Sequence, residues 1–201
     1  MVRRRPATSL RGRPRSQRAR RAVLDAARRL FAERGYGAAT VEAIAARSGV
    51  AKTTIYRWWP NRASLLVDVL VETAAAMAPL PQGRDPLQAL RLELRRTAVA
   101  AKGFTGRLLT ALLGQAQQDP TVRAALHGRL FHPRREASAA AVRRAQAAGA
   151  LRPDVAPRVA VDLLFGPLFF RVFVQHEPVT EAFANQAFQY VIQGLRPAGH
   201  R

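Results

Sequence analysis

Residues 41–60 read VEAIAARSGVAKTTIYRWWP, and this stretch decides the fold of the first third of the chain. Ile44, Val50 and Ile55 place apolar side chains where two short helices, separated by a tight turn, would face each other. Gly49 stands at the turn, where a residue without a β-carbon avoids steric strain. The spacing predicts a helix-turn-helix motif.

The second helix of this motif turns polar side chains outward. Such a helix lies in the major groove of DNA, where Lys and Thr side chains reach base edges or phosphates and a Tyr hydroxyl donates to a phosphate. The residues that we expect to contact DNA from this helix are Lys52, Thr53, Thr54, Tyr56 and Arg57. Two adjacent indoles follow, and since both cannot face the core, we expect Trp59 to pack inward and Trp58 to stay partly exposed.

The positive charge of the chain is concentrated around this motif. The sequence holds 33 Lys and Arg against 13 Asp and Glu, a formal net charge of +20, and nine of the arginines lie in residues 1–21 without any acid. So large a charge favours a polyanionic partner, nucleic acid before an anionic membrane. Residues 1–15, rich in Arg, Pro and Gly, predict a basic disordered arm. Arg13 and Arg15 in this arm suit the narrow minor groove of DNA.

Helical periodicity continues from Ser16 almost to the C-terminus and predicts an all-α fold. We expect four segments: the arm at 1–15, a helix-turn-helix domain at 16–62, a linker helix at 63–80, and a helical bundle at 81–201. Within the bundle, helices are expected at 86–102, 105–118, 121–148, 155–176 and 179–196. The helix at 155–176 is apolar on nearly every side, which favours burial against a second copy of the chain as well as its own core.

Composition and spacing argue against catalysis. The absence of cysteine excludes a disulfide scaffold, a Cys-based zinc site and a thiol nucleophile. The four histidines are too scattered for a metal site, and no Gly-rich phosphate loop follows a strand. We therefore expect no enzymatic activity, no catalytic residue, no metal and no cofactor. The sequence has neither a secretory signal nor the roughly 18 consecutive apolar residues of a membrane span, which favours a cytoplasmic protein without membrane contact.

The chain resembles the TetR/AcrR family of bacterial transcriptional regulators. The matching stretches are AARRLFAERGY at 26–36, TVEAIA at 40–45, GVAKTTIY at 49–56 and WPNR at 59–62. The resemblance implies a three-helix, homeodomain-like DNA-binding domain joined by a linker helix to a larger helical domain that dimerises and binds a small effector. It repeats the DNA contacts expected from the second helix of the motif, and it adds Thr40 and Arg62.

These observations predict a sequence-specific regulator, and specifically a ligand-responsive repressor. It would bind a pseudo-palindromic operator as a homodimer, through the helices at 155–176 and 179–196, and a small, largely apolar effector would release it. Six of the nine phenylalanines lie between residues 104 and 173, which suggests a pocket in the bundle. The candidate lining residues are Leu108, Leu112, Gln115, Phe131, Phe165, Phe169 and Phe173.

Two other classes of protein fit parts of the sequence. A non-specific architectural nucleic-acid-binding protein would share the charge and the arm, but it needs no large apolar C-terminal body. A membrane-surface protein would use an amphipathic helix with a basic face. Residues 121–148 imitate such a helix through Arg134, Arg135, Arg143 and Arg144, which we interpret as a solvated face.

Overall fold

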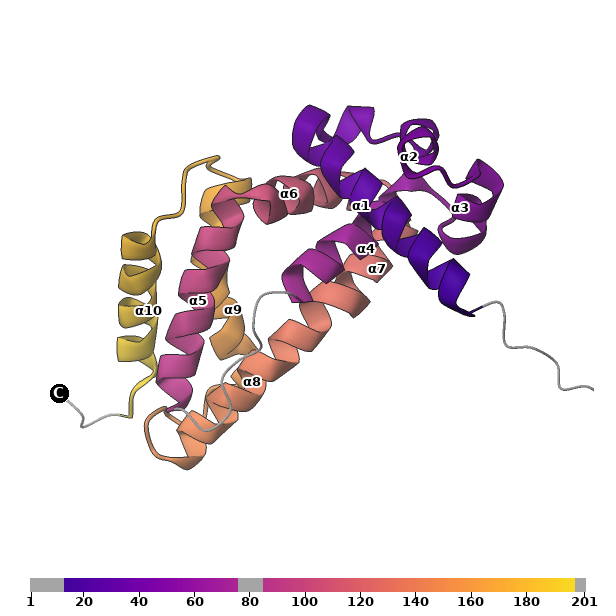
Figure 1. Cartoon of the computed structure of the whole chain (residues 1–201). Coiled ribbons are helices and arrows are strands. Elements are labelled where there is room, and N and C mark those ends of the chain that lie inside the picture. Colours follow the sequence, from indigo (N-terminus) through magenta and orange to yellow (C-terminus); the bar gives the residue numbers. More distant parts are fainter. Residues whose placement is uncertain (1–12, 76–84, 198–201) are drawn as a thin grey trace, which may run out of the picture. The chain divides into compact units, whose positions relative to one another are not determined.

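The structure, a computed structural model, describes residues 13–75 and 85–197 (Figure 1). Every regular element within these ranges is a helix, so the all-α prediction is confirmed. The chain divides into two compact units between Val69 and Leu70. This division falls inside the fourth helix, and Leu70 and Ala74, beyond the division, line a cavity of the second unit.

The first unit consists of α1 (Arg13–Ala38), α2 (Val41–Ser48), α3 (Lys52–Trp58) and the beginning of α4 (Arg62–Ala75). Helix α1 begins three residues before the expected start at Ser16. Pro14 permits this, because the first turn of a helix has no use for the backbone N–H that proline lacks. Residues 1–12 of the expected arm lie outside the described residues.

The core of the first unit gathers around the face that α1 turns toward α2. The side chains of Ile44 and Ile55 are fully buried, as the helix-turn-helix spacing predicts. Trp59 is buried and Trp58 is half-buried, so the expectation for the two indoles is confirmed. Arg20 of α1 forms an ion pair with the buried Asp68 of α4, and the Arg20 guanidinium lies 5.3 Å from the centre of the Trp59 ring.

The second unit contains α5 (Pro86–Lys102), α6 (Phe104–Ala116), α7 (Pro120–Leu126), α8 (His132–Ala147), α9 (Pro157–Phe173) and α10 (Glu181–Leu195). The helix expected at 121–148 is interrupted by a wider, π-helical turn at His127–Phe131, and Pro133 lies in the first turn of α8. The other expected helices occur within a few residues of their predicted bounds.

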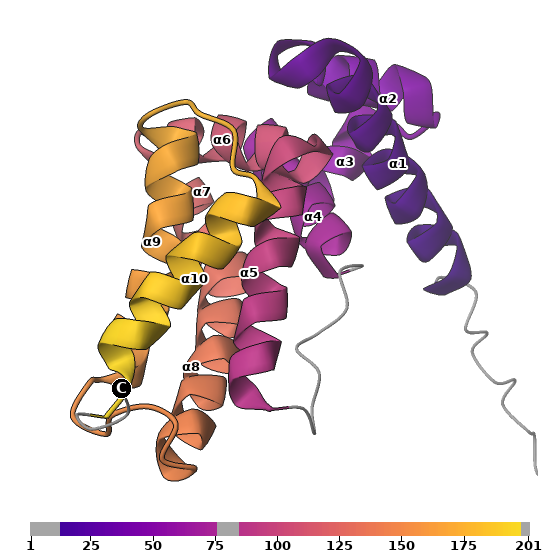
Figure 2. The same cartoon turned by 90° about the vertical axis from the view of Figure 1, so that its left-hand side faces the viewer.

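Helix α5 is the centre of the second unit, since it packs against α6, α8, α9 and α10. Helix α10 lies along α5 and α9 (Figure 2). Arg95 of α5 holds Glu181 at the start of α10 with hydrogen bonds of 2.9 and 2.5 Å. At the corner between α5 and α6, a β-carbon on Gly106 would lie 1.9 Å from the Ala101 carbonyl oxygen, so the close approach requires glycine. Within the described ranges, no helix is long and apolar enough to span a bilayer.

Candidate DNA interface and effector cavity

The turn between α2 and α3 is built from backbone geometry that only a few residues tolerate. Gly49 has φ 69° and ψ 15°, in the left-handed region, and its N–H donates to the Ala45 carbonyl oxygen over 3.0 Å. The Ser48 hydroxyl accepts a hydrogen bond from the Val50 N–H over 3.3 Å. The N–H groups of Gly49 and Val50 are therefore both satisfied, and α3 starts after only three intervening residues.

Helix α3 presents one polar face to solvent. Lys52, Thr53, Tyr56 and Arg57 are exposed, and they follow one another at the spacing of a single helical face. Tyr56 is 49% exposed, whereas Ile55 on the opposite face is completely buried. Thr54 is half-buried between the two faces. The sequence therefore identified the outward face of this helix, with Thr54 at its edge.

Thr40 and Arg62, the two contacts implied by resemblance, both have structural tasks within the first unit. The Thr40 hydroxyl caps α2 by accepting a hydrogen bond from the Ala43 N–H over 3.1 Å. Arg62 donates to the carbonyl oxygens of Tyr36 and Gly37 over 3.3 and 3.4 Å. Its guanidinium also lies 4.2 Å from the centre of the Tyr36 ring.

Arg13 and Arg15 are the two remaining candidates. Their backbone lies in α1, and their side chains are outside the described part of the structure. The structure therefore brings together the outward residues of α3 and gives a place to Thr40 and Arg62, without assigning the two arginines of the arm.

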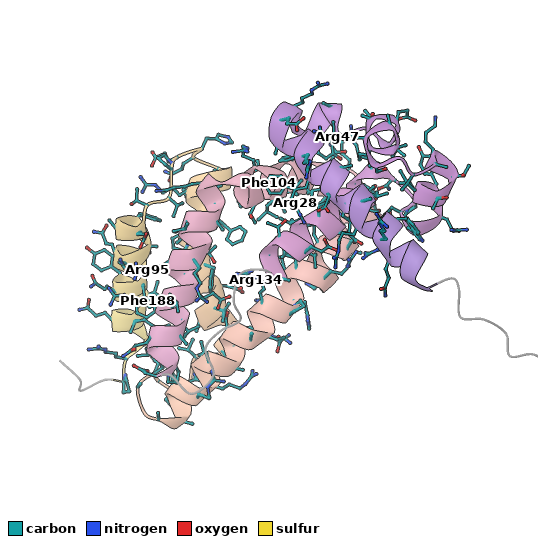
Figure 3. The ribbon with its side chains drawn as sticks, viewed as in Figure 1. Arg28, Arg47, Arg95, Phe104, Arg134 and Phe188 are labelled. Carbon is teal, nitrogen blue, oxygen red and sulfur yellow. The ribbon has the colours of Figure 1, made fainter. Side chains whose placement is uncertain are left out.

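Two ion pairs organise the charges around the motif. Arg47 of α2 forms two hydrogen bonds of 2.6 Å with Glu33 of α1, which lower the pKa of the Glu33 carboxyl (Figure 3). The Lys52 ammonium lies 3.5 Å from a carboxylate oxygen of Glu42 in the first turn of α2. A phosphate that approaches α3 would therefore compete with Glu42 for the Lys52 ammonium.

A cavity of about 400 Å³ lies in the second unit. Its wall is mainly aliphatic and aromatic. The residues that line it come from α4 (Leu70, Ala74), α5 (Glu93, Thr97, Ala100, Ala101), α6 (Thr105, Gly106, Leu109), the π-helical turn and α8 (Leu130, Phe131, Arg134, Arg135, Ser138), and α9 (Val161, Asp162, Phe165, Gly166, Leu168, Phe169, Val172, Phe173).

The four phenylalanines among the predicted lining residues do line the cavity. Phe131, Phe165, Phe169 and Phe173 line it, and the rings of Phe131 and Phe169 meet edge to face with their centres 6.1 Å apart. The predictions for α6 are wrong.

On α6, Leu108 and Leu112 are fully buried in the core and Gln115 is exposed, whereas Leu109 faces the cavity. The prediction assigned Leu108 to the cavity, but the face of α6 that lines the cavity carries Leu109, one residue or about 100° further around the helix axis.

Sequence reasoning missed the polar residues of the cavity. Glu93 is only 9% exposed, and one of its carboxylate oxygens accepts a hydrogen bond of 2.8 Å from the Ser138 hydroxyl. Burial raises the pKa of the Glu93 carboxyl, although the Ser138 hydrogen bond and the charge of Arg134 act in the opposite direction. Arg134, which Figure 3 labels on α8, approaches Glu93 to 3.8 Å.

The interpretation of residues 134, 135, 143 and 144 as one solvated face is therefore half wrong. Arg143 and Arg144 are exposed, but Arg134 and Arg135 are half-buried and line the cavity, where Arg135 forms an ion pair with Asp162. A signal for Glu93 was present in the sequence, because helical spacing places it beside Leu90 and Leu94 on the apolar stripe of α5.

A helix-turn-helix with an exposed polar recognition helix, followed by a helical unit that contains an apolar cavity, defines a DNA-binding transcriptional regulator. Residues 23–69 match the family described as "Bacterial regulatory proteins, tetR family". Residues 80–191 match the family described as "Tetracyclin repressor-like, C-terminal domain". The chain belongs to the TetR family of transcriptional regulators.

Relatives share both units of the chain. The uncharacterized HTH-type transcriptional regulator YdeS of Bacillus subtilis is 30% identical over 188 residues, which cover 94% of this chain and 95% of that protein. The crystal structure of the TetR family transcription regulator SCO0332 is similar with a TM-score of 0.75 and 34% identity, over 89% of this chain and 99% of that one. FadR from Bacillus subtilis, solved in complex with stearoyl-CoA, shares the fold with a TM-score of 0.66 at 19% identity, over 88% of this chain and 99% of that one.

Proposed function

We propose that the protein is a ligand-responsive repressor, which binds a pseudo-palindromic operator as a homodimer and leaves it when a small, largely apolar effector occupies the cavity. The observation that carries this proposal is the lining of the cavity by Leu70 and Ala74 of α4. Helix α4 begins at Arg62, three residues after α3 ends with its cap at Trp59. One continuous helix therefore connects the residues after the recognition helix with the cavity wall.

Linkage between the two sites follows from this arrangement. An effector that fits the cavity better in one position of α4 shifts the protein toward that position by its difference in affinity. Two recognition helices of a dimer reach successive major grooves only when they are about 34 Å apart. A displacement of α4 that changes this spacing weakens operator binding. FadR from Bacillus subtilis, which has the same fold, was solved in complex with stearoyl-CoA, so a protein of this fold can hold a ligand with a long apolar chain.

Operator contact would come from the outward face of α3, with Lys52, Thr53, Tyr56 and Arg57 in the major groove. Thr54 would contribute from the edge of this face. Thr40, at the positive end of α2, and Arg62 would approach phosphates in addition to their tasks inside the unit. Arg13 and Arg15 would follow the adjacent minor groove as part of the basic arm.

Dimerisation would use the exposed apolar stripe of α9. Val159, Leu163 and Phe170 are about half exposed along one helical face, and Val174, the residue that caps the helix, is 61% exposed. Helix α10, which lies along α9, adds the exposed ring of Tyr190. Exposed apolar patches of this kind mark protein interfaces, and a second copy of the stripe is its natural complement in a two-fold dimer.

The same proposal places the protein in the cytoplasm, where its operator lies, and gives it a regulatory rather than an enzymatic role. Neither a metal nor a cofactor is needed for a mechanism that consists of binding equilibria at two sites.

Selection of operators from a random duplex library tests the proposal. We expect an enriched inverted repeat with half-sites one helical turn apart. Enrichment without any inverted repeat would contradict the dimeric operator. Binding without sequence preference would favour the alternative, a non-specific architectural nucleic-acid-binding protein.

A further inference from the structure

The effector cavity contains a buried carboxylate with too few hydrogen-bond donors. Glu93 lines the cavity from α5, and its side chain is 10% exposed. An ionised carboxylate offers about four acceptor positions. A buried charge is costly unless it is paired and hydrogen-bonded, so the donors around Glu93 decide which ligand the cavity favours.

The donors that the protein supplies to Glu93 are weak. The Ser138 hydroxyl donates to one carboxylate oxygen over 2.8 Å, but the same hydroxyl is also 3.1 Å from the Arg134 carbonyl oxygen, so its single proton serves two acceptors. The other carboxylate oxygen lies 3.8 Å from a guanidinium nitrogen of Arg134. This distance is too long for a hydrogen bond.

The remaining charges of the cavity do not favour an anionic ligand. Arg135 is already in a close ion pair with Asp162, which neutralises its charge, although its buried Nε has no hydrogen-bond partner. The side chain of Arg134 is one-third exposed, so water solvates its charge better than the charge of Glu93, whose side chain is only 10% exposed. An anion placed against Arg134 would also lie close to the carboxylate of Glu93 and be repelled by it.

The apolar wall of the cavity favours a cation with an apolar body. Phe131, Phe169 and Phe173 form a row in which neighbouring ring centres are 6.1 and 5.4 Å apart. Aromatic faces attract organic cations, and apolar area removed from water stabilises the bound state. Thr97, one helical turn from Glu93, offers a hydroxyl at the same polar end of the cavity.

We propose that the effector is an amphipathic organic cation, whose ammonium group donates a hydrogen bond to Glu93 and whose apolar body lies among the phenylalanines. This inference rests on the proposed function in one respect, that the cavity is the effector site. The ammonium supplies the donor that Glu93 lacks, and a charged hydrogen bond in a water-poor site is about twice as strong as a neutral one.

Three ligands of equal chain length test the class of ligand. Decylammonium, decanol and decanoate are titrated by calorimetry into the DNA-free full chain at neutral pH, below the concentrations at which they form micelles. We expect decylammonium to bind most tightly and decanoate most weakly. Equal binding of all three, tighter binding of decanoate, or no binding of decylammonium would overturn the proposal, and none of these comparisons depends on a variant that folds.

Substitution of the carboxylate locates the contact. Glu93→Gln should weaken decylammonium by about 10- to 100-fold and leave decanol nearly unchanged, because the lost interaction is a hydrogen bond to a charged group. Glu136→Gln is the matched control, since it removes a carboxylate of α8 that pairs with Arg158 and does not line the cavity, and it should have little effect on decylammonium. A Glu93→Gln chain that binds decylammonium as tightly as the unmodified chain would overturn the proposal.

The outcome is separable from that of the proposed function. Operator selection is carried out without ligand, so its result does not depend on the class of effector. Release of the operator by decanoate or decanol, but not by decylammonium, would contradict the cationic effector and leave the ligand-responsive repressor standing. Failure to select any operator would contradict the repressor, whereas the calorimetric comparison would still decide which ligand the cavity favours.

Discussion

The guanidinium of Arg62, at the start of α4, lies 4.2 Å from the centre of the Tyr36 ring and donates to the Tyr36 carbonyl oxygen. This contact joins the last turn of α1 to the helix that follows the recognition helix. Arg62→Ala should therefore lower the free energy of unfolding by about 1–2 kcal/mol, the sum of a cation–π contact and a hydrogen bond. Denaturant unfolding measures the loss.

The matched control for Arg62 is Arg57, an exposed arginine on α3. Arg57→Ala should leave stability unchanged but lower operator affinity and reduce the salt slope of binding by about one. If Arg62→Ala leaves the unfolding midpoint unchanged and weakens only DNA binding, the contact with Tyr36 has no structural value.

The outward face of α3 should contribute hydrogen bonds to the operator. Thr53→Ala and Tyr56→Phe each remove a hydroxyl from exposed positions, so we expect operator affinity to fall by about 2- to 10-fold without a change in thermal unfolding. Fluorescence anisotropy with the selected operator measures the effect. Thr110→Ala, which removes an exposed threonine hydroxyl from α6, is the control and should bind normally. Undiminished affinity in both α3 variants would place the interface elsewhere.

Glu42 should restrain DNA binding. Its carboxylate lies 3.5 Å from the Lys52 ammonium and close to the expected path of the phosphates. Glu42→Gln frees Lys52 and removes a like charge, so operator affinity should rise by about two- to fivefold at low salt, and the gain should fade as salt screens the charge. An affinity that is unchanged or reduced at low salt would show that Lys52 does not approach the backbone.

The exposed stripe of α9 should hold the dimer together. Leu163 is 48% exposed on this stripe, and a glutamate there would bury a charge in the interface. Leu163→Glu should sediment as a monomer and bind the operator more weakly. Val99→Glu, at a position of α5 that is 54% exposed, is the control and should remain dimeric. A Leu163→Glu chain that sediments as a dimer would remove α9 from the interface.

Glu93 should make stability depend on pH. Because burial raises its pKa in the folded state, the folded chain holds a proton that the unfolded chain releases near pH 4.3. Stability from this group is present below that pH and is lost as pH rises through the folded pKa. The unfolding free energy of the unmodified chain minus that of Glu93→Gln should therefore fall with rising pH. A difference that is constant or rises with pH would contradict a raised pKa.

The first unit was predictable because its constraints are local. Gly49 and the spacing of Ile44 and Ile55 determine the turn and the face of α3 within about ten residues. Trp59, the indole that we expect to pack inward, is buried. The task of Arg62 was not predictable, because its partner Tyr36 lies 26 residues earlier and only the tertiary fold brings the two together.

The cavity was predictable in its aromatic part and not in its polar part. The concentration of phenylalanines can be seen in the sequence. Whether Leu108 or Leu109 faces the cavity depends on how α6 is rotated about its axis, which is set by its packing against α5 and α7. Glu93 carried a local signal, an acid on an apolar stripe. The sequence could not show its hydrogen-bond partner, because Ser138 lies 45 residues away on α8.

The account depends most directly on coupling between the cavity and the operator. The affinity of the selected operator should be measured with and without saturating ligand, and the affinity of the ligand with and without saturating operator. Linkage requires both affinities to fall by the same factor, and we expect about 5- to 150-fold. A ligand that fills the cavity and leaves operator affinity unchanged would contradict the ligand-responsive repressor.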